Sequence, residues 1–392
     1  MLYREPARLE QNLYLYSMAG IYLHIPFCKK KCHYCDFFSL ATTRYREAFI
    51  TALHKEILLR KDYLAGETIE TIYFGGGTPS LLSAETIQAL LQAIRTNFKL
   101  APEPEITLEA NPDDLDLSSL QGFFAAGINR LSIGIQSFCD EDLLSLNRVH
   151  SGTQAIKCLH DAKTAGFQNI SIDLIYGIPG LSLEAWKGNL DIFASLDIPH
   201  LSSYWLTIET GTALAGFIRK GKYPPLDEAI GAAHFNYLME WAKANQFLHY
   251  EVSNYAREGC LSRHNTAYWQ AVPYLGLGPS AHSYNGSSRQ WNLSNLSTYI
   301  KGISEGETVS EEEQIDTRQR FNEYIMTSLR TMWGCDLTYI ERTFGYPYAE
   351  NTKQMARKYI EKAWLQEKGN VLFVLEEGWL QLDGMSAELF ST

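Results

Sequence analysis

Three cysteines lie close together in the stretch Ile21–Phe38, which reads IYLHIPFCKKKCHYCDFF. Cys28, Cys32 and Cys35 follow the spacing C-x3-C-x2-C. Three thiolates on one short loop can converge on a single point, and three sulfurs suit a cubane iron–sulfur cluster, which takes four ligands. The iron without a protein ligand would then keep an open position, as catalytic metals often do.

Three other interpretations of these cysteines are weaker. A disulfide is disfavoured because the chain has seven cysteines and no recognisable secretory signal. A structural zinc site with His24 or His33 as fourth ligand stays open, although no second C-x2-C half follows. Inert core cysteines are also disfavoured, because Lys29, Lys30 and Lys31 indicate a loop near water. These lysines would favour the thiolate over the thiol.

The cysteine spacing resembles the signature of the radical S-adenosylmethionine (SAM) superfamily, which follows the first strand of a barrel. The longer motif around these cysteines is Y-x-H-I-P-F-C-x-x-x-C-x-Y-C-D-F. It resembles one particular family, that of oxygen-independent coproporphyrinogen III oxidase and its relative HemW, the haem chaperone. This resemblance implies a [4Fe-4S] cluster on the three cysteines, with SAM bound to the open iron. In such proteins an electron from the cluster splits SAM into methionine and a 5′-deoxyadenosyl radical.

Further motifs follow in the order of that family. The turn GGGTP at 75–79 lets the backbone approach a ligand, and it is no phosphate loop because no G-K-[ST] follows. The motif L-E-A-N-P puts a carboxylate at the end of a predicted strand, where βα barrels carry their functional groups. The resemblance implies SAM contacts from the following residues: Tyr22, Tyr34, Gly76, Gly77, Thr78, Glu109, Gln136, Arg148 and Asp173.

Some of these residues have ordinary structural interpretations as well. Glu109 could be a solvated strand end, and Arg148 could be a surface arginine. Asp173 lies within an apolar strand, so it needs either a structural partner or a polar cavity. Residue type alone leaves these alternatives open.

A second informative block is RHNTAYW at 263–269. A histidine with Tyr and Trp nearby offers an axial iron ligand and flat apolar surfaces for a porphyrin. Histidines beside aromatic residues are more often packed, hydrogen-bonded core residues. The wording H-N-x-x-Y-W resembles a HemW motif and implies haem binding by His264, with His282 as a weaker second candidate.

Six strand-like segments alternate with helical patterns to position these residues. They are expected at 21–25, 68–74, 105–110, 130–137, 169–176 and 200–209. Alternating strands and helices indicate βα units around a parallel sheet. We therefore expect an α/β fold, a partial (β/α)6 TIM-like barrel of the radical SAM type, with its loops gathered at the C-terminal rim.

The pattern changes after about residue 300. Residues 302–314 are acidic and suggest an exposed linker or helix start. Helices are expected at 317–332, 336–344 and 351–367, and the segment NVLFVLEEGWLQLDG suggests a hairpin that turns at Glu376-Glu377-Gly378. This predicts a small winged-helix-like α+β domain whose acidic wing suits a lid, not a DNA reader.

Three segments are therefore expected. They are a disordered tail at 1–17, a barrel with the HNxxYW segment at 18–300, and the C-terminal domain at 301–392. The 392 residues carry a net charge of −11, which disfavours nucleic acid as a partner. No apolar run approaches the ~20 residues of a membrane span. With no secretory signal, we expect a reducing, cytoplasmic location.

One departure separates the two relatives. Phe37 stands where the oxidase carries a further cysteine, in C-x3-C-x2-C-x-C. The oxidase also has a longer N-terminal extension, and no extra cationic cluster for propionates is obvious here. The resemblance thus favours a haem chaperone that binds haem and delivers it to an acceptor haemoprotein, as a monomer or homodimer. The alternative is an oxidase that decarboxylates coproporphyrinogen III to protoporphyrinogen IX.

Overall fold

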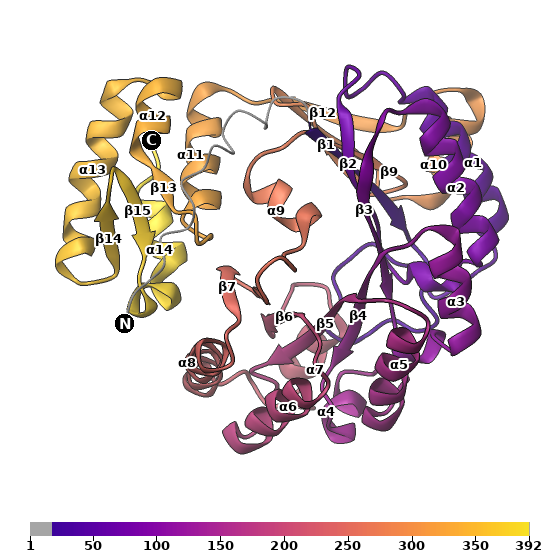
Figure 1. Cartoon of the computed structure of the whole chain (residues 1–392), viewed down its shortest axis with the longest axis horizontal. Helices are drawn as coiled ribbons and strands as arrows, with labels where there is room; N and C mark the ends of the chain where they lie inside the picture. The colour runs from indigo at the N-terminus through magenta and orange to yellow at the C-terminus, as the bar shows by residue number, and fades with distance from the viewer. Residues whose placement is uncertain (1–17, 392) are drawn as a thin grey trace.

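The computed structural model describes residues 18–391. A curved twelve-stranded sheet with surrounding helices forms the larger part of the molecule (Figure 1). A three-stranded sheet with its own helices forms the smaller part. The tail predicted for residues 1–17 lies outside the described residues, and no helix within residues 18–391 is long and apolar enough to cross a membrane.

Seven neighbouring strands of the large sheet run parallel, in the order β9-β1-β2-β3-β4-β5-β6. Their bounds are β1 (Met18–Ile25), β2 (Thr68–Gly76), β3 (Leu100–Ala110), β4 (Arg130–Gln136), β5 (Asn169–Tyr176), β6 (His200–Trp205) and β9 (Tyr274–Leu277). The six predicted strands and their parallel pairing are confirmed. The sequence analysis did not predict β9, which adds to the β1 edge.

Antiparallel strands extend both edges of this parallel core. Beyond β9 lie β10 (His282–Tyr284), β11 (Ser288–Asn292) and β12 (Ser310–Gln314), and beyond β6 lie β8 (Asn254–Ala256) and β7 (Leu248–Glu251). β7 and β8 form a short antiparallel pair. The expectation of an exposed linker or helix start at 302–314 is wrong for residues 310–314, because these residues form β12, which pairs with β11. An outermost strand exposes its side chains to water, which is why β12 can be almost wholly acidic.

Helices join the strands and cover the outer face of the curved sheet (Figure 1). Their bounds are α1 (Arg46–Leu59), α2 (Ala84–Asn97), α3 (Leu117–Ala126), α4 (Asp140–Ser145), α5 (Gly152–Thr164), α6 (Leu183–Ser195), α7 (Ala213–Arg219), α8 (Glu228–Ala244) and α10 (Leu296–Glu305), with single 3-10 turns η3 (Pro79–Leu81) and η4 (Pro112–Asp114). Ser83 caps α2 by accepting the N–H of Thr86.

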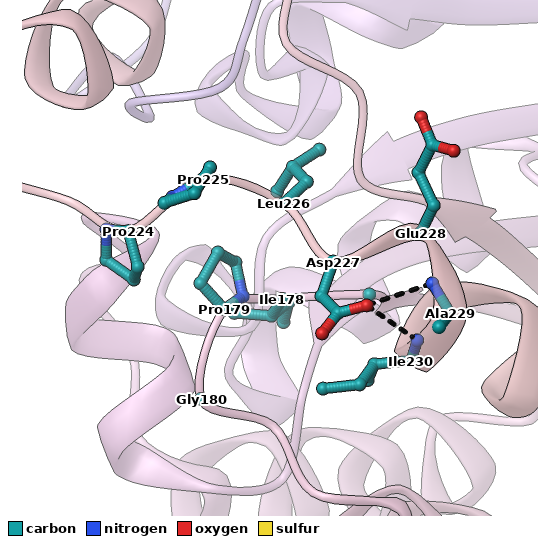
Figure 2. A pocket seen from close by; sticks show the side chains of 11 residues that line it. Ile178, Pro179, Gly180, Pro224, Pro225, Leu226, Asp227, Glu228, Ala229 and Ile230 are labelled. Carbon is teal, nitrogen blue, oxygen red and sulfur yellow. Dashed lines mark hydrogen bonds between the residues drawn. The ribbon is translucent and has the colours of Figure 1, made fainter.

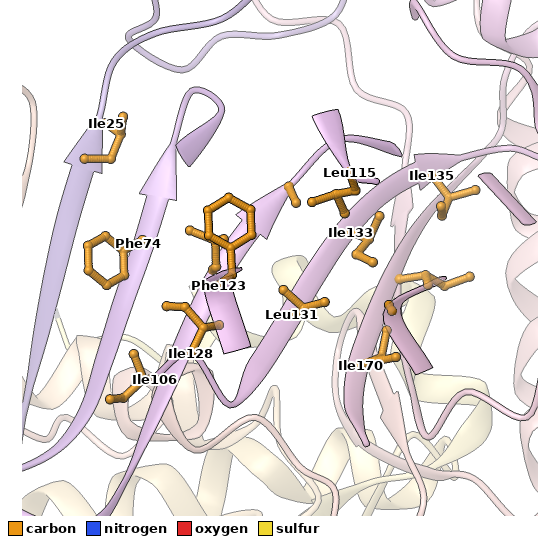
Figure 3. Packing of buried hydrophobic residues seen from close by; sticks show 14 of the residues in the cluster. Ile25, Phe74, Ile106, Leu115, Phe123, Ile128, Leu131, Ile133, Ile135 and Ile170 are labelled. Atoms are coloured by element: carbon orange, nitrogen blue, oxygen red, sulfur yellow. The ribbon is translucent and has the colours of Figure 1, made fainter. Parts of the chain in front are cut away.

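The main core lies between the sheet and these outer helices. Figure 3 shows Ile106 on β3 and Leu131 and Ile133 on β4 packed with Phe123 of α3, and all four are buried. The side chains of β4 alternate between the two faces of the sheet. Its apolar side chains face the outer helices, and Ser132, Gly134 and Gln136 lie on the opposite, inner face.

Helix α9 (Arg263–Trp269) lies on the inner side of the sheet, near β1 and β2 (Figure 1). It carries the HNxxYW segment. Its first turn is fixed by the carboxylate of Glu105, which accepts the N–H groups of Arg263 and His264 at 3.1 and 3.0 Å. A carboxylate at a helix N-terminus also interacts favourably with the helix dipole.

The C-terminal domain has its own hydrophobic core around Phe321 and Ile340. Its elements are α11 (Thr317–Ser328), β13 (Cys335–Asp336), α12 (Leu337–Phe344), α13 (Tyr346–Glu361), β14 (Leu365–Lys368), β15 (Val371–Val374), η5 (Glu376–Gln381) and α14 (Leu382–Glu388). The hairpin predicted within 370–384 is wrong, because only β15 falls in this segment and residues 376–388 are helical; β15 pairs instead with β14 through the turn Gly369-Asn370. Both turn residues have positive φ, 59° and 65°, which two-residue hairpin turns require.

The C-terminal domain closes the open side of the partial barrel. The chain leaves the sheet at β12, and the domain then bonds to the turn after β7, near the opposite edge. The N–H of Val252 donates to the carbonyl of Arg330 at 3.0 Å, and that of Met332 to the carbonyl of Tyr250 at 2.9 Å. Because β12 belongs to the large sheet, we place the boundary between the two parts after Gln314.

Candidate functional site

The cysteine loop is held between the ends of two parallel strands. It begins directly after β1, and the N–H of Cys28 donates to the carbonyl of Leu40 at 3.0 Å. The GGGTP turn after β2 contacts the same place: Gly77 and Thr78 donate their N–H groups to the carbonyls of Ile25 and Phe27 at 2.8 and 2.7 Å. The loop and the turn therefore lie together at the C-terminal rim.

A polar network connects two of the cysteine sulfurs. The hydroxyl of Thr78 donates to Sγ of Cys28, and Nη1 of Arg148 donates to Sγ of Cys32, each at 3.4 Å. Asn111 joins the two donors, since it donates to Oγ1 of Thr78 at 3.1 Å and accepts from Arg148 at 2.6 Å. Hydrogen bonds to ligand sulfurs are a standard way in which proteins tune iron–sulfur clusters.

The donor set fits a polynuclear cluster better than a single metal ion. Cys28, Cys32 and Cys35 are free, partly exposed thiols. Yet within residues 18–391 no three His, Cys, Asp or Glu side chains are arranged to hold one metal ion. The cysteines of a cubane cluster bind different irons, so they lie further apart than the ligands of one zinc ion. The geometry therefore does not favour the zinc alternative.

The charge of Lys31 lowers the pKa of Cys35, as expected from the lysine run, but burial outweighs this effect. Burial raises the pKa of both Cys28 and Cys35. Lys29 forms ion pairs with Asp113 and Asp114 and does not contact a sulfur. Its charge is thus largely compensated by the loop after β3.

Glu109 lies at the end of β3, beside the GGGTP turn. Its carboxylate accepts from the hydroxyl of Tyr73 at 2.8 Å and from the N–H of Gly76 at 3.1 Å. Burial raises the pKa of Glu109 to about 7, and the nearby carboxylate of Asp173 adds to the rise. A carboxylate held in this way can accept from the ammonium group of an amino-acid ligand.

Gln136, Arg148 and Asp173 surround the ends of β4 and β5. Gln136 has a φ of 71° at a register shift in β4, a backbone conformation that non-glycine residues rarely adopt. Arg148 also donates to the carbonyl of Gly134 at 2.6 Å, so it is not the free surface arginine of the ordinary interpretation. Burial raises the pKa of Asp173 to about 6, against the lowering effects of Ser202 and Arg130.

Tyr22 and Tyr34, the two tyrosines predicted to contact SAM, both lie near this rim. The hydroxyl of Tyr22 shares a hydrogen bond with Nδ1 of His24 at 3.1 Å, and Nε2 of His24 bonds to the carbonyl of Phe38 at 2.8 Å. Tyr34 is close to Cys32 and Arg148, and burial, followed by the charge of Cys32, raises its pKa. The structure thus brings Tyr22, Tyr34 and the cysteine loop to one place, while their contact with SAM stays a prediction.

His264 is buried on the inner side of the sheet, with only 2% of its surface exposed. Its Nδ1 shares a hydrogen bond with Thr71 at 2.7 Å, and its Nε2 shares one with the hydroxyl of Tyr268 at 2.9 Å. The ring also stacks on Tyr73, with centroids 4.9 Å apart. Burial, with the charge of Arg130, lowers its pKa to about 3. Haem ligation by His264 stays a prediction that requires the hydrogen bond at the ligating nitrogen to open, while the other ring nitrogen can keep its bond.

A large cavity of about 1620 Å³ separates the inner face of the sheet from the C-terminal domain. It exceeds the roughly 300–1,000 Å³ of most small-molecule pockets. Its lining joins the cysteine loop, the ends of β1 and β10, helix α9, and helices α11 and α12. His24 and His282 are the histidines in this lining, whereas His264 is not part of it.

A second, smaller cavity of about 550 Å³ lies at the start of α8 (Figure 2). It is lined by the turn at 177–180 after β5 and by residues 224–230. Asp227 points to the start of the helix and accepts the N–H groups of Ala229 and Ile230 at 2.9 and 3.2 Å (Figure 2). This carboxylate is therefore occupied as a helix cap.

Comparison with known proteins agrees with this geometry. A model of the Radical SAM superfamily matches residues 22–191. The Heme chaperone HemW of Mycobacterium tuberculosis is 36% identical over 324 residues, which cover 81% of this chain and 83% of that protein. The Heme chaperone HemW of Bacillus subtilis is 31% identical over 93% of this chain and 97% of that protein. The chain belongs to the HemW family.

The fold of this HemW family member matches a solved structure over almost its full length. Coproporphyrinogen III oxidase (HemN) from Escherichia coli, a radical SAM enzyme, superposes with a TM-score of 0.84, covering 96% of this chain and 91% of that one. The sequence identity is 23%, so this likeness establishes the shared fold. The predicted radical SAM fold with a C-terminal α+β domain is thereby confirmed.

Two residues of the site were not among the predicted ones. Asn111 joins the donors to both sulfurs, and Tyr73 connects His264 to Glu109 by stacking and a hydrogen bond. Asn111 stands within the motif L-E-A-N-P, so its place beside Glu109 was a usable signal. Tyr73 lies in an apolar strand, where nothing in the sequence separates it from a core residue.

Proposed function

We propose that this HemW family member is a haem chaperone that holds a [4Fe-4S] cluster, binds SAM, and passes haem to an acceptor haemoprotein. The observation that carries the proposal is the meeting of the cysteine loop, the GGGTP turn and Glu109 at one rim, where Cys35 of the loop also lines the large cavity. The names of the curated relatives supply haem as the cargo.

In this proposal each group has a definite task. Cys28, Cys32 and Cys35 hold the cluster, which when bound supplies an electron to SAM or serves as its anchor. Glu109 and the backbone of the GGGTP turn orient the amino group of SAM, and Arg148 is placed to attract its carboxylate. Arg148 also donates to Cys32, so it lies where the cluster and SAM would meet.

The second candidate function is oxidative decarboxylation of coproporphyrinogen III. The likeness in fold to HemN from Escherichia coli keeps this alternative in view. Against it stands Phe37, which has 69% of its surface exposed, lines the cavity, and occupies the position of the oxidase's additional cysteine. We therefore propose the chaperone as the function of this chain.

The test is an anaerobic assay of the full chain after cluster reconstitution. It supplies SAM and a reductant, with either haem or coproporphyrinogen III. The chaperone proposal expects haem binding, transfer to an apo-haemoprotein, and no protoporphyrinogen. Decarboxylated porphyrin together with methionine and 5′-deoxyadenosine would identify the oxidase instead. Cys35→Ala should lose the cluster, whereas Cys139→Ala, a change outside the cysteine loop, should keep it.

A further inference from the structure

We propose that haem binds in the large cavity with His282 as its axial iron ligand and Arg320 as an anchor for a propionate. This inference rests on the proposed haem chaperone function and assigns the site of the cargo. His282 and Arg320 both line the cavity; His282 lies on β10 of the large sheet, and Arg320 lies on α11 of the C-terminal domain.

The availability of its imidazole distinguishes His282. Of the two histidines in the lining, His24 has both ring nitrogens in hydrogen bonds. Within residues 18–391 the ring of His282 has no hydrogen-bond partner, and the residue is exposed to the cavity. Burial and the charge of Arg289 lower its pKa, so the imidazole is neutral near pH 7. A neutral imidazole is the form that binds iron.

The sheet around His282 offers a flat, mostly aromatic surface. β10 and β11 pair so that His282 lies opposite Trp291 and Tyr284 lies opposite Arg289. Directly opposed residues share one face of a sheet, and so do residues two apart along a strand. The ring of Trp291 stacks beside His282, with centroids 6.1 Å apart. This surface suits a planar macrocycle with its iron over His282.

Two arginines lie near this aromatic surface, and the charge of only one of them is uncompensated. Arg289 on the sheet pairs with Glu323 of α11 at 2.7 Å, so its charge is compensated. The guanidinium of Arg320, one turn before Glu323 on the same helix, has no ion-pair or hydrogen-bond partner among the described residues. The positive charges of Arg320 and Arg289 both act to lower the pKa of the Tyr284 hydroxyl, which burial raises. Arg320 is thus placed to bind a carboxylate at the edge of the aromatic surface.

The cavity also places the cargo beside the cluster and SAM site. Its lining includes Cys35, Tyr22 and Phe38. Helix α9 contributes Tyr268 and Trp269 to the same lining. The HNxxYW segment would therefore contact haem through its aromatic residues, while His264 stays behind them in contact with β2.

Titration of the reconstituted full chain with ferric haem and with iron-free protoporphyrin IX tests the assignment. His282→Ala should weaken ferric haem binding at least tenfold and remove the imidazole signature from the absorption and electron paramagnetic resonance spectra. The same variant should bind iron-free porphyrin as the wild type does. Arg320→Gln should weaken both ligands several-fold, and Arg318→Gln, on the same helix but outside the cavity lining, should weaken neither.

The outcomes separate this inference from the proposed function. If the wild type binds no haem, the chaperone proposal itself fails. If the wild type binds haem, and His264→Ala loses the imidazole signature while His282→Ala keeps it, the present assignment is overturned and the chaperone stands. Far-ultraviolet circular dichroism and the cluster's absorption verify that each variant is folded.

Discussion

Nη1 of Arg148 donates to Sγ of Cys32 across 3.4 Å, although 116 residues separate the two in the chain. The same guanidinium donates to Asn111 and to the carbonyl of Gly134. A cationic donor on a ligand sulfur stabilises the reduced, more negative cluster. Arg148 therefore joins Cys32, a ligand of the predicted cluster, to Asn111 after β3 and to Gly134 on β4.

We expect Arg148→Gln to lower the reduction potential of the cluster. Losing a positive donor disfavours the reduced state, and a charge-assisted hydrogen bond contributes about 1.5–3 kcal/mol. Allowing for partial replacement by water, a shift on the order of 50 mV to more negative potential is expected for a one-electron couple. A redox titration followed by electron paramagnetic resonance measures it. Arg95→Gln, on the outer helix α2, is the control, and an unchanged potential in Arg148→Gln would refute the role.

SAM binding should depend on pH through Glu109. Its pKa is raised to about 7, so the carboxylate becomes protonated as the pH falls through 7 and loses its attraction for the SAM ammonium. The amino group, with an ordinary pKa near 7.7–8.0, stays protonated in this range. Affinity should fall roughly tenfold between pH 7 and pH 5.5.

Isothermal titration calorimetry of the reconstituted protein measures this dependence. Glu109→Gln should bind SAM more weakly at pH 7 and lose the pH dependence. Glu85→Gln, an exposed change on α2, should keep both. Because Tyr73, Asp173 and Arg130 also influence the carboxylate, a pH dependence that survives in Glu109→Gln would assign the titration to another group.

Gly77→Ala should destabilise the rim. A Cβ at this position would lie 2.7 Å from the carbonyl oxygen of Phe27 and 2.8 Å from that of Ile25, so the backbone would have to shift. Overpacking of this kind costs about 1–3 kcal/mol. Gly188→Ala is the matched control, because no atom lies within 4 Å of its added Cβ and it sits in α6.

Chemical denaturation and iron content after reconstitution give the readout for these glycine variants. Gly188→Ala should be neutral or up to about 1 kcal/mol more stable. Equal effects of the two substitutions would show that the close backbone approach at Gly77 carries no constraint.

The contact between the sheet and the C-terminal domain should weaken as the pH rises. Glu251 is 1% exposed and lies at the turn that bonds to this domain, and burial raises its pKa to about 7. A folded-state pKa above the unfolded value of about 4.3 stabilises the fold at low pH, and this stability is lost as the pH rises through 7. Between pH 5 and pH 7 the free energy of unfolding should fall by about 2 kcal/mol.

Urea denaturation at several pH values tests this in the wild type and in Glu251→Gln. The variant should lack the part of this fall that Glu251 contributes, whereas Glu109 and Asp173, whose pKa values burial also raises, keep their contributions. Glu258→Gln, an exposed change seven residues later, should behave as the wild type. A wild type whose stability does not depend on pH in this window would contradict the prediction.

The parallel core was predictable because its strands are apolar and its turns carry Gly, Asn, Asp and Pro. The edges were not, because strands such as β12 and β9 have few residues and no alternating pattern. Their place in the sheet depends on partners that are distant in sequence. The hairpin around Gly369-Asn370 was missed because the strand before it, Leu365–Lys368, is mostly polar and was assigned to the helix expected at 351–367.

The candidate site, too, was predictable only in part. Motif spacing was enough to suggest the cysteines, Glu109 and Arg148 as a group, and the structure brings them together. Sequence gave no means of seeing that Asn111 joins the two sulfur donors or that both ring nitrogens of His264 are engaged. Such facts depend on which atoms meet across elements that are far apart in the chain.

The two edges of the large sheet bear on how this protein can meet other proteins. One edge ends in β12, where Glu311, Glu312 and Glu313 follow one another, so a second acidic strand placed alongside would be repelled. The other edge ends near Glu251, where the C-terminal domain is already bonded. Among the described residues neither edge invites the addition of a strand. If the proposed chaperone function holds, an acceptor haemoprotein should therefore approach the faces and loops around the large cavity.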